Sequence, residues 1–302
     1  VAAVGIPLTT VTTGLRGVLE AYEDFRGVNM LRMLLGAANF GLPALSVLLV
    51  GTSLAWMVVS LILARLIVLL AHTKLVNDRL TSGWLVVKID RKDIRQLFSF
   101  GAWMTVSNVV SPLMVTADRF VISAFLGAGM VAYYTVPFEA LIRVLIIPGA
   151  LTSALFPRLA ATLTTDHELA RKLYRDCRRV LLAVLLPVCV VIFVGAKWGL
   201  TFWLGEDFAQ HAWVVVCIMA IGLLFNGLAH VPFAAVQAAG NAKTTAILHM
   251  VELALYLPVL IILLNYFGIL GAAVAWTIRV LLDLAGLTVF ARNLMAGRGS
   301  SK

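Results

Sequence analysis

Four charged side chains lie inside apolar stretches that are long enough to cross a membrane. Glu139 and Arg143 share one stretch, and Arg65 and Arg279 lie in two others. An ionisable group at that depth is costly, so it normally faces a bundle interior or a wet cavity and has a partner. A guanidinium binds phosphate through two parallel hydrogen bonds. The three arginines are therefore candidates for binding a phosphorylated substrate.

Glu139 and Arg143 are four residues apart, which places them on one face of a helix and within pairing distance. Two interpretations carry equal weight. In the first interpretation the two residues form a structural ion pair that neutralises itself. In the second interpretation they face the substrate. Asn108 and Arg119, in the preceding stretch, complete the residues expected to line a cavity for a diphosphate and its sugar.

Two further carboxyl groups, Glu252 and Asp283, are candidates for ion coupling. Asp283 follows Arg279 by four residues, so this pair can also be internal. Glu252 has no Lys or Arg within one turn and is expected either to be protonated or to pair with an arginine of another helix. His230 and His249 can titrate, but an isolated histidine in a membrane is more often an interhelical hydrogen-bonding group.

Prolines inside the apolar stretches suggest hinges. Pro43 and Pro112 each free the carbonyl four residues earlier, which belongs to Asn39 and to Asn108 respectively. Pro148 is the third hinge candidate. Kinked helices suit lobes that rock against each other, although each kink can also be permanent and supported by packing.

The elements that must position these residues are transmembrane helices. Hydrophobic residues make up 61% of the chain and charged residues 13%. Apolar runs near 20 residues recur along it, so the sequence predicts an all-α polytopic membrane protein with about nine transmembrane helices. The alternating short segments of a membrane β-barrel are absent. The predicted spans are about 1–18, 30–50, 54–75, 97–126, 130–156, 180–198, 213–239, 245–266 and 269–294.

The distribution of basic residues predicts the domain organisation and the orientation. We expect residues 1–80 to be the second half of a first lobe, 81–96 a cytoplasmic amphipathic connector, 97–295 a complete six-helix lobe and 296–302 a cytoplasmic tail. Alternation of the spans then places nearly every loop Lys and Arg in the cytoplasm. The net charge of +9 follows from this topology, so it does not indicate a nucleic-acid partner.

A weak internal repeat supports two similar lobes. The run LILARLIVLLA, at 61–71, resembles WTIRVLLDLA, at 276–285, and it aligns Arg65 with Arg279. Because the first three spans resemble the last three, the repeat predicts three further helices upstream of Val1, making two six-helix halves of the same orientation. The alternative is a chance match between two leucine-rich helices.

Three short motifs are similar to a known family. They are FGAWMTVSNVV at 100–110, ADRFVISAFLG at 117–127 and YYTVP at 133–137, followed by Phe156-Pro157 and a basic helix. Together they resemble the polysaccharide transporter family of Wzx-type O-antigen and exopolysaccharide flippases. This family belongs to the multidrug/oligosaccharidyl-lipid/polysaccharide exporter superfamily. The likeness covers essentially the whole chain, which aligns with helices four to twelve of a twelve-helix family member.

That resemblance implies a function. Family members translocate an undecaprenyl-diphosphate-linked oligosaccharide across the bacterial cytoplasmic (inner) membrane by alternating access. The expected partners are this substrate, membrane lipids and a polysaccharide polymerase of the same pathway. No enzymatic activity, cofactor or metal is expected, because the sequence contains no phosphate-binding loop, no metal-spaced Cys/His cluster and no nucleophile elbow.

Two alternatives are less favoured. A drug exporter of the same superfamily, coupled to a cation as in MATE transporters, would have a smaller cavity with more acidic and aromatic lining residues and fewer arginines. A membrane glycosyltransferase would carry catalytic acids on a large loop, whereas the loops here are short and basic.

Overall fold

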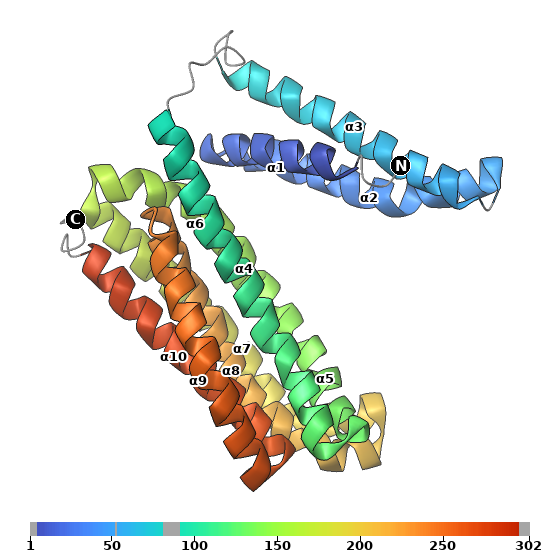
Figure 1. Ribbon diagram of the computed structural model, residues 1–302, viewed down its shortest axis with the longest axis vertical. Coiled ribbons are helices and arrows are strands. Elements are labelled where there is room, and N and C mark those ends of the chain that lie inside the picture. The colour runs from blue at the N-terminus through green and yellow to red at the C-terminus, as the bar shows by residue number, and fades with distance from the viewer. Residues whose placement is uncertain (1–4, 52, 81–90, 296–302) are drawn as a thin grey trace. The chain divides into compact units, whose positions relative to one another are not determined.

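The computed structural model (Figure 1) describes residues 5–51, 53–80 and 91–295. Within these residues the chain is helical and has no strand, which confirms the predicted all-α class. Of the connector expected at 81–96, residues 81–90 lie outside the described residues. The expected tail, 296–302, lies outside them entirely.

Contacts divide the chain into two compact units, residues 1–90 and 91–302. In its described part the first unit is a bundle of three helices, in which α3 packs against both α1 and α2. The bundle closes around a small apolar core that includes Leu19 and Val76. The helices are α1 (Gly5–Ala21), α2 (Phe25–Val50) and α3 (Leu54–Arg79).

The second unit is built around α8, the most deeply buried of its helices. Small and apolar residues occur all round α8, which suits a helix with neighbours on every side. Its most extensive contacts are with α7 and α10, and α4 packs along α9 (Figure 1). The elements are α4 (Arg91–Leu126), α5 (Ala128–Leu141), the 3₁₀ segment η3 (Ile142–Leu145), α6 (Ile146–Thr165), α7 (His167–Leu204), α8 (Glu206–Ala238), α9 (Ala242–Phe267) and α10 (Ile269–Met295).

The helices have the length and hydropathy of membrane spans. Eight spans within the described residues are long and apolar enough to cross a bilayer, with α5, η3 and α6 together forming one of them. The remaining helix, α1, has 17 described residues. The protein is therefore a multi-pass membrane protein, as the composition predicts.

Sharp connections join the helices of the second unit. Gly127, Gly205 and Gly268 all have positive φ, a conformation that suits glycine, and each separates two consecutive helices. Asp166 begins α7 by accepting hydrogen bonds from the backbone N–H groups of Glu168 and Leu169, at 3.0 Å each. These short links force neighbouring helices to pack as antiparallel pairs.

One predicted hinge coincides with a break in a helix. Pro148 follows η3, and its ring excludes the carbonyl of Val144 from regular α-helical bonding, which accounts for the 3₁₀ turn there. Pro43 and Pro112, by contrast, lie inside α2 and α4, which continue through them. Movement at all three prolines stays a prediction.

The α9–α10 hairpin gives a test of the packing. A methyl group on Gly271 would overlap the backbone carbonyl of Leu263, which cannot rotate away. We expect Gly271→Ala to lower the free energy of unfolding by roughly 3 kcal/mol, near the upper end for overpacked sites. Thermal unfolding of the purified full-length protein in detergent measures this. The matched control is Gly199→Ala, where an added methyl meets no described atom within 4 Å; equal melting temperatures for the two variants would contradict the packing.

Candidate functional site

The polar side chains of α9 and α10 share the interface between these two helices. On each helix they recur at intervals of three and four residues, which keeps them on one face. The helices pack along each other, so the two faces meet (Figure 1). The residues concerned are His249, Glu252 and Tyr256 on α9 and Arg279 and Asp283 on α10. Trp276, also on α10, instead contacts Phe138 of α5 and lies against Gly222 of α8.

Asp118, on α4, is the most buried acid of the second unit, with no exposed surface. Its two carboxylate oxygens accept hydrogen bonds from different helices: Tyr134 Oη of α5 donates at 2.9 Å and Tyr256 Oη of α9 at 2.5 Å. Hydrogen bonds to an ionised acceptor are the strong ones. Asp118 therefore ties three helices together and has donors that stabilise its charge.

Arg279 is the cation of this interior. It is 9% exposed, its Nη1 lies 3.6 Å from Met114 Sδ, and its guanidinium carbon lies 5.9 Å from the ring centroid of Tyr256. It is close enough to Asp118 and Glu252 for their charges to interact. Packing over an aromatic ring stabilises a buried guanidinium. Arg279 thus serves as a counter-ion for acids on other helices.

Asp283 has a different partner from the one that its spacing suggests. Its Oδ1 lies 3.7 Å from His249 Nε2, across the α9–α10 interface, instead of pairing with Arg279 on its own helix. The His249 ring also stacks on Phe233, with centroids 5.9 Å apart. The internal Arg279–Asp283 pair considered from the sequence is therefore replaced by an interhelical one.

His249, Glu252 and Asp283 form a compact set of possible ligands, whose ligand atoms all lie within 4.8 Å of one another. Glu252 is buried, and no donor of the described part of the chain hydrogen-bonds to its carboxylate oxygens, but the Asp283 carboxyl is close enough to share a proton with it. Residue spacing in the sequence does not reveal this set, because its members come from two different helices. The arrangement can hold a cation or share protons.

The charges of this interior do not balance. We use the name buried acid cluster for Asp118, His249, Glu252, Arg279 and Asp283. Three carboxyl groups of the cluster face one guanidinium, so full ionisation with a neutral His249 leaves an excess of negative charge. An excess charge in a low-dielectric interior is costly. The buried acid cluster is therefore suited to take up a proton or a small cation.

A small cavity reaches the buried acid cluster. It has a volume of about 260 Å³ and lies between α9 and α10. Glu252, Tyr256 and Arg279 contribute its polar lining, and aliphatic side chains of both helices make up the rest. The cavity therefore lies directly beside the Glu252 carboxyl.

Of the two interpretations of Glu139 and Arg143, the ion pair between them is not formed in the structure. Glu139 pairs instead with Arg119, across the turn between α4 and α5. The reason is the helix break: α5 ends at Leu141 and Arg143 lies in η3, where each residue turns further than in an α-helix. Arg143 consequently leaves the face of Glu139, and its side chain is exposed.

The other predicted substrate residues belong to both units. Asn108 is exposed on α4. Arg65, on α3 of the first unit, lies against Gly5 of α1, where a methyl group would overlap its guanidinium. Arg65 and Arg279 belong to different units, and their sharing of a cleft stays a prediction.

Sequence analysis missed Asp118 and its two tyrosines as site residues. A signal for Asp118 was present, because it is a carboxyl group inside a predicted span, the same argument that selected Glu252. The tyrosines had no such signal. Tyr134 and Tyr256 are 16 and 138 residues from Asp118 in the sequence, so only the fold identifies them.

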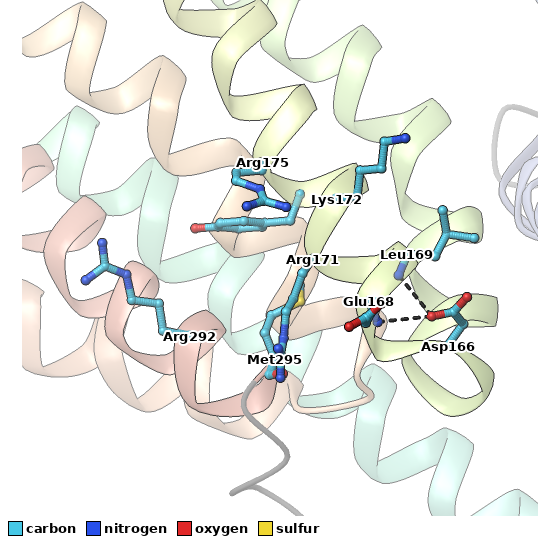
Figure 2. A pocket seen from close by; sticks show the side chains of 9 residues that line it. Asp166, Glu168, Leu169, Arg171, Lys172, Arg175, Arg292 and Met295 are labelled. Atoms are coloured by element: carbon cyan, nitrogen blue, oxygen red, sulfur yellow. Dashed lines mark hydrogen bonds between the residues drawn. The ribbon is translucent and has the colours of Figure 1, made fainter.

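A basic pocket lies where α7 begins and α10 ends, with a volume of about 860 Å³ (Figure 2). Arg171 Nε donates to the carbonyl of Met295 at 2.9 Å and so satisfies one of the last carbonyls of α10. Lys172, Arg175 and Arg292 also line the pocket. The predicted orientation puts this pocket on the cytoplasmic side.

Comparison with known proteins gives one family and one fold. Residues 1–213 match the family described as "Polysaccharide biosynthesis protein". A curated protein of Shigella flexneri, named "Putative O-antigen transporter", is 38% identical over 282 residues, which are 93% of this chain and 66% of that protein. The chain thus spans about two thirds of the length of this relative.

Similar solved structures include MATE transporters. A mutant of the Vibrio cholerae MATE transporter VcmN superposes with a TM-score of 0.83 at 18% identity, over 95% of this chain and 66% of that one. An outward-facing multidrug resistance MATE transporter of the MOP superfamily gives 0.80 at 14% identity, over 95% and 67%. At such identities the similarity shows the fold alone.

Proposed function

Because this chain belongs to the polysaccharide biosynthesis protein family, we propose that it forms part of a flippase for an undecaprenyl-diphosphate-linked oligosaccharide. The relative named for O-antigen transport supports this substrate class. We place the protein in the bacterial cytoplasmic membrane, with membrane lipids around it and a polysaccharide polymerase as a further partner.

The buried acid cluster is the observation that supports active transport most strongly. Three carboxyl groups face one guanidinium beside a 260 Å³ cavity, and no donor of the described residues hydrogen-bonds to the oxygens of Glu252. A bound proton or cation favours whichever arrangement of α4, α9 and α10 best satisfies these charges. Release of the ion then favours another arrangement, which is the condition for alternating access.

The diphosphate of the substrate requires cations outside this cluster. Arg143 fits that role, because it is exposed and carries no ion pair with Glu139. We retain Arg65, Arg119, Asn108 and Glu139 as further cavity residues, as proposed from the sequence. Arg279 is surrounded by acids and an aromatic ring, so we assign it the role of counter-ion to these acids and not that of a substrate contact. A drug exporter fits less well, because the MATE similarity is confined to the fold.

The proposed function is tested by genetics and lipid analysis. Cells in which the gene is deleted should lose surface polysaccharide and accumulate lipid-linked oligosaccharide in the inner leaflet. The full-length gene should restore export, whereas a gene for a MATE drug exporter should not. Unchanged surface polysaccharide in the deletion strain, together with new sensitivity to cationic drugs, would favour the drug exporter instead.

Arg143 offers a test of the diphosphate contact. We expect Arg143→Ala to lower export of surface polysaccharide at least about tenfold, because a hydrogen bond to a charged group contributes roughly 1.5–3 kcal/mol. Protein abundance in the membrane should stay unchanged, since the side chain is exposed. Arg179→Ala, at an exposed site on α7, is the matched control. Normal export by the Arg143 variant would remove this residue from the substrate site.

A further inference from the structure

A second large pocket of the second unit lies apart from the buried acid cluster. Its volume is about 940 Å³, and it is formed by the first turns of α4, by α6 and by the α8–α9 turn. We call it the α4–α9 pocket. The predicted orientation places it at the cytoplasmic side of the membrane.

The charge of the α4–α9 pocket is positive. Lys92, Arg95 and Lys243 line it, and none of the lining residues that the structure describes is acidic. Two of these cations come from α4 and one from the start of α9. A positive concave surface of this kind favours an anion that can be held from several sides, such as a diphosphate.

The pocket also has an aromatic wall. Trp103, Phe100 and Phe156 line it, and Lys243 Nζ lies 5.8 Å from the Trp103 ring centroid. An aromatic ring supplies a flat apolar surface with large contact area. One face of a pyranose ring carries mainly C–H groups and packs well on such a surface. The cation and the ring are therefore close enough to hold a phosphate and the adjoining sugar.

Gln237 adds a hydrogen-bonding group to this wall. It is 3% exposed and lines the pocket. Its Nε2 donates to Thr245 Oγ1 at 3.0 Å, which fixes the amide, while its Oε1 has no hydrogen-bond partner among the described residues. An unsatisfied buried acceptor is costly unless a ligand supplies a donor. A sugar hydroxyl is such a donor.

We propose that the α4–α9 pocket binds the diphosphate and first sugar of the lipid-linked substrate on the cytoplasmic side, before translocation. This inference rests on the proposed flippase function and adds a loading site to it. Lys92, Arg95 and Lys243 bind the diphosphate, Trp103 packs on the sugar ring and Gln237 accepts from a hydroxyl. An anionic phospholipid head group would use the cations but would leave the aromatic wall and Gln237 without a role.

Binding of two soluble probes tests the site. The first probe is N-acetylglucosamine linked through a diphosphate to a geranyl chain, and the second is geranyl diphosphate without the sugar. Each is titrated by calorimetry into the full-length protein in neutral detergent. We expect the sugar probe to bind about fivefold more tightly, as one aromatic contact allows. Trp103→Ala should remove this preference and Trp103→Phe should keep it. Lys243→Gln should weaken both probes about tenfold.

Matched controls separate the α4–α9 pocket from general effects of charge and folding. Two control variants should bind both probes like the wild type. They are Lys172→Gln, in the basic pocket where α7 begins and α10 ends, and Trp198→Ala, at a site 83% exposed on α7. A preference for the sugar probe that survives Trp103→Ala, together with wild-type affinity for both probes in Lys243→Gln, would overturn the loading site and leave the flippase proposal standing. Equal displacement of both probes by phosphatidylglycerol, with no preference for sugar, would make the pocket a lipid site. Absence of binding to the wild type would contradict both proposals.

Discussion

Replacing Glu252 by glutamine is expected to lower export of surface polysaccharide by roughly 100-fold. Glu252 lies in the buried acid cluster, and no donor of the described residues hydrogen-bonds to its oxygens. If a proton or cation on Glu252 sets the balance between two states, a neutral amide fixes that balance. A state reduced to about 1% of the population lowers the transport rate in proportion. Export in a deletion strain carrying the variant measures the effect.

The shape of glutamine keeps this test specific. The amide side chain would fill the same space as the carboxyl side chain of Glu252, so we expect normal abundance of the variant in the membrane. Glu206→Gln is the matched control, because Glu206 is exposed at the first turn of α8. Asp283→Asn should show a similar loss, since Asp283 belongs to the same ligand set. Export near the wild-type rate in both cluster variants would exclude coupling through these carboxyl groups.

Replacing Arg279 by glutamine is expected to destabilise the protein by about 3–5 kcal/mol, the cost of leaving buried charges without their counter-ion. Arg279 is the counter-ion for Asp118 and Glu252 and is itself buried between Met114 and Tyr256. Its loss leaves Glu252 without a guanidinium partner and leaves Asp118 with the weaker influence of Arg119. Thermal unfolding in detergent and the yield of folded protein both measure the change.

A double variant shows whether charge causes this loss. Arg279→Gln combined with Asp118→Asn removes one charge of each sign. An amide in place of the Asp118 carboxyl can accept from one of Tyr134 and Tyr256 through its oxygen and donate through its nitrogen to the hydroxyl oxygen of the other. We expect the double variant to unfold at a higher temperature than the single Arg279 variant. Arg179→Gln is the surface control, and exposed pairs such as Arg179–Asp176 contribute little. No recovery in the double variant would mean that Arg279 acts through its shape.

The helices were largely predictable, because a bilayer requires long apolar stretches and these are visible in composition alone. The exceptions have local causes. The basic helix expected after Phe156-Pro157 and the span expected at 180–198 lie in the single helix α7. Ala170, Cys177, Leu181 and Leu185 form one buried stripe along it, and the chain continues as a helix from the basic half into the apolar half.

The candidate site was predictable only where one residue carries the signal. Glu252, Arg279 and Asp283 stand out as ionisable groups inside apolar spans. Their partners did not, because Tyr256 approaches Asp118 and His249 approaches Asp283 across helix interfaces. The Glu139–Arg143 pair failed for the opposite reason: spacing assumes a regular helix, and η3 interrupts it.

The central claim is that the buried acid cluster couples an ion to movement of a lipid-linked oligosaccharide, and transport across a defined membrane tests it most directly. The full-length protein would be reconstituted in vesicles with a fluorescent prenyl-diphosphate oligosaccharide, and its transfer between leaflets followed with and without an imposed proton or sodium gradient. We expect one of the gradients to accelerate transfer by the wild type and to have no effect on Glu252→Gln. The account would be contradicted if neither gradient changed the transfer rate of the wild type, or if a gradient accelerated transfer by Glu252→Gln as much as transfer by the wild type.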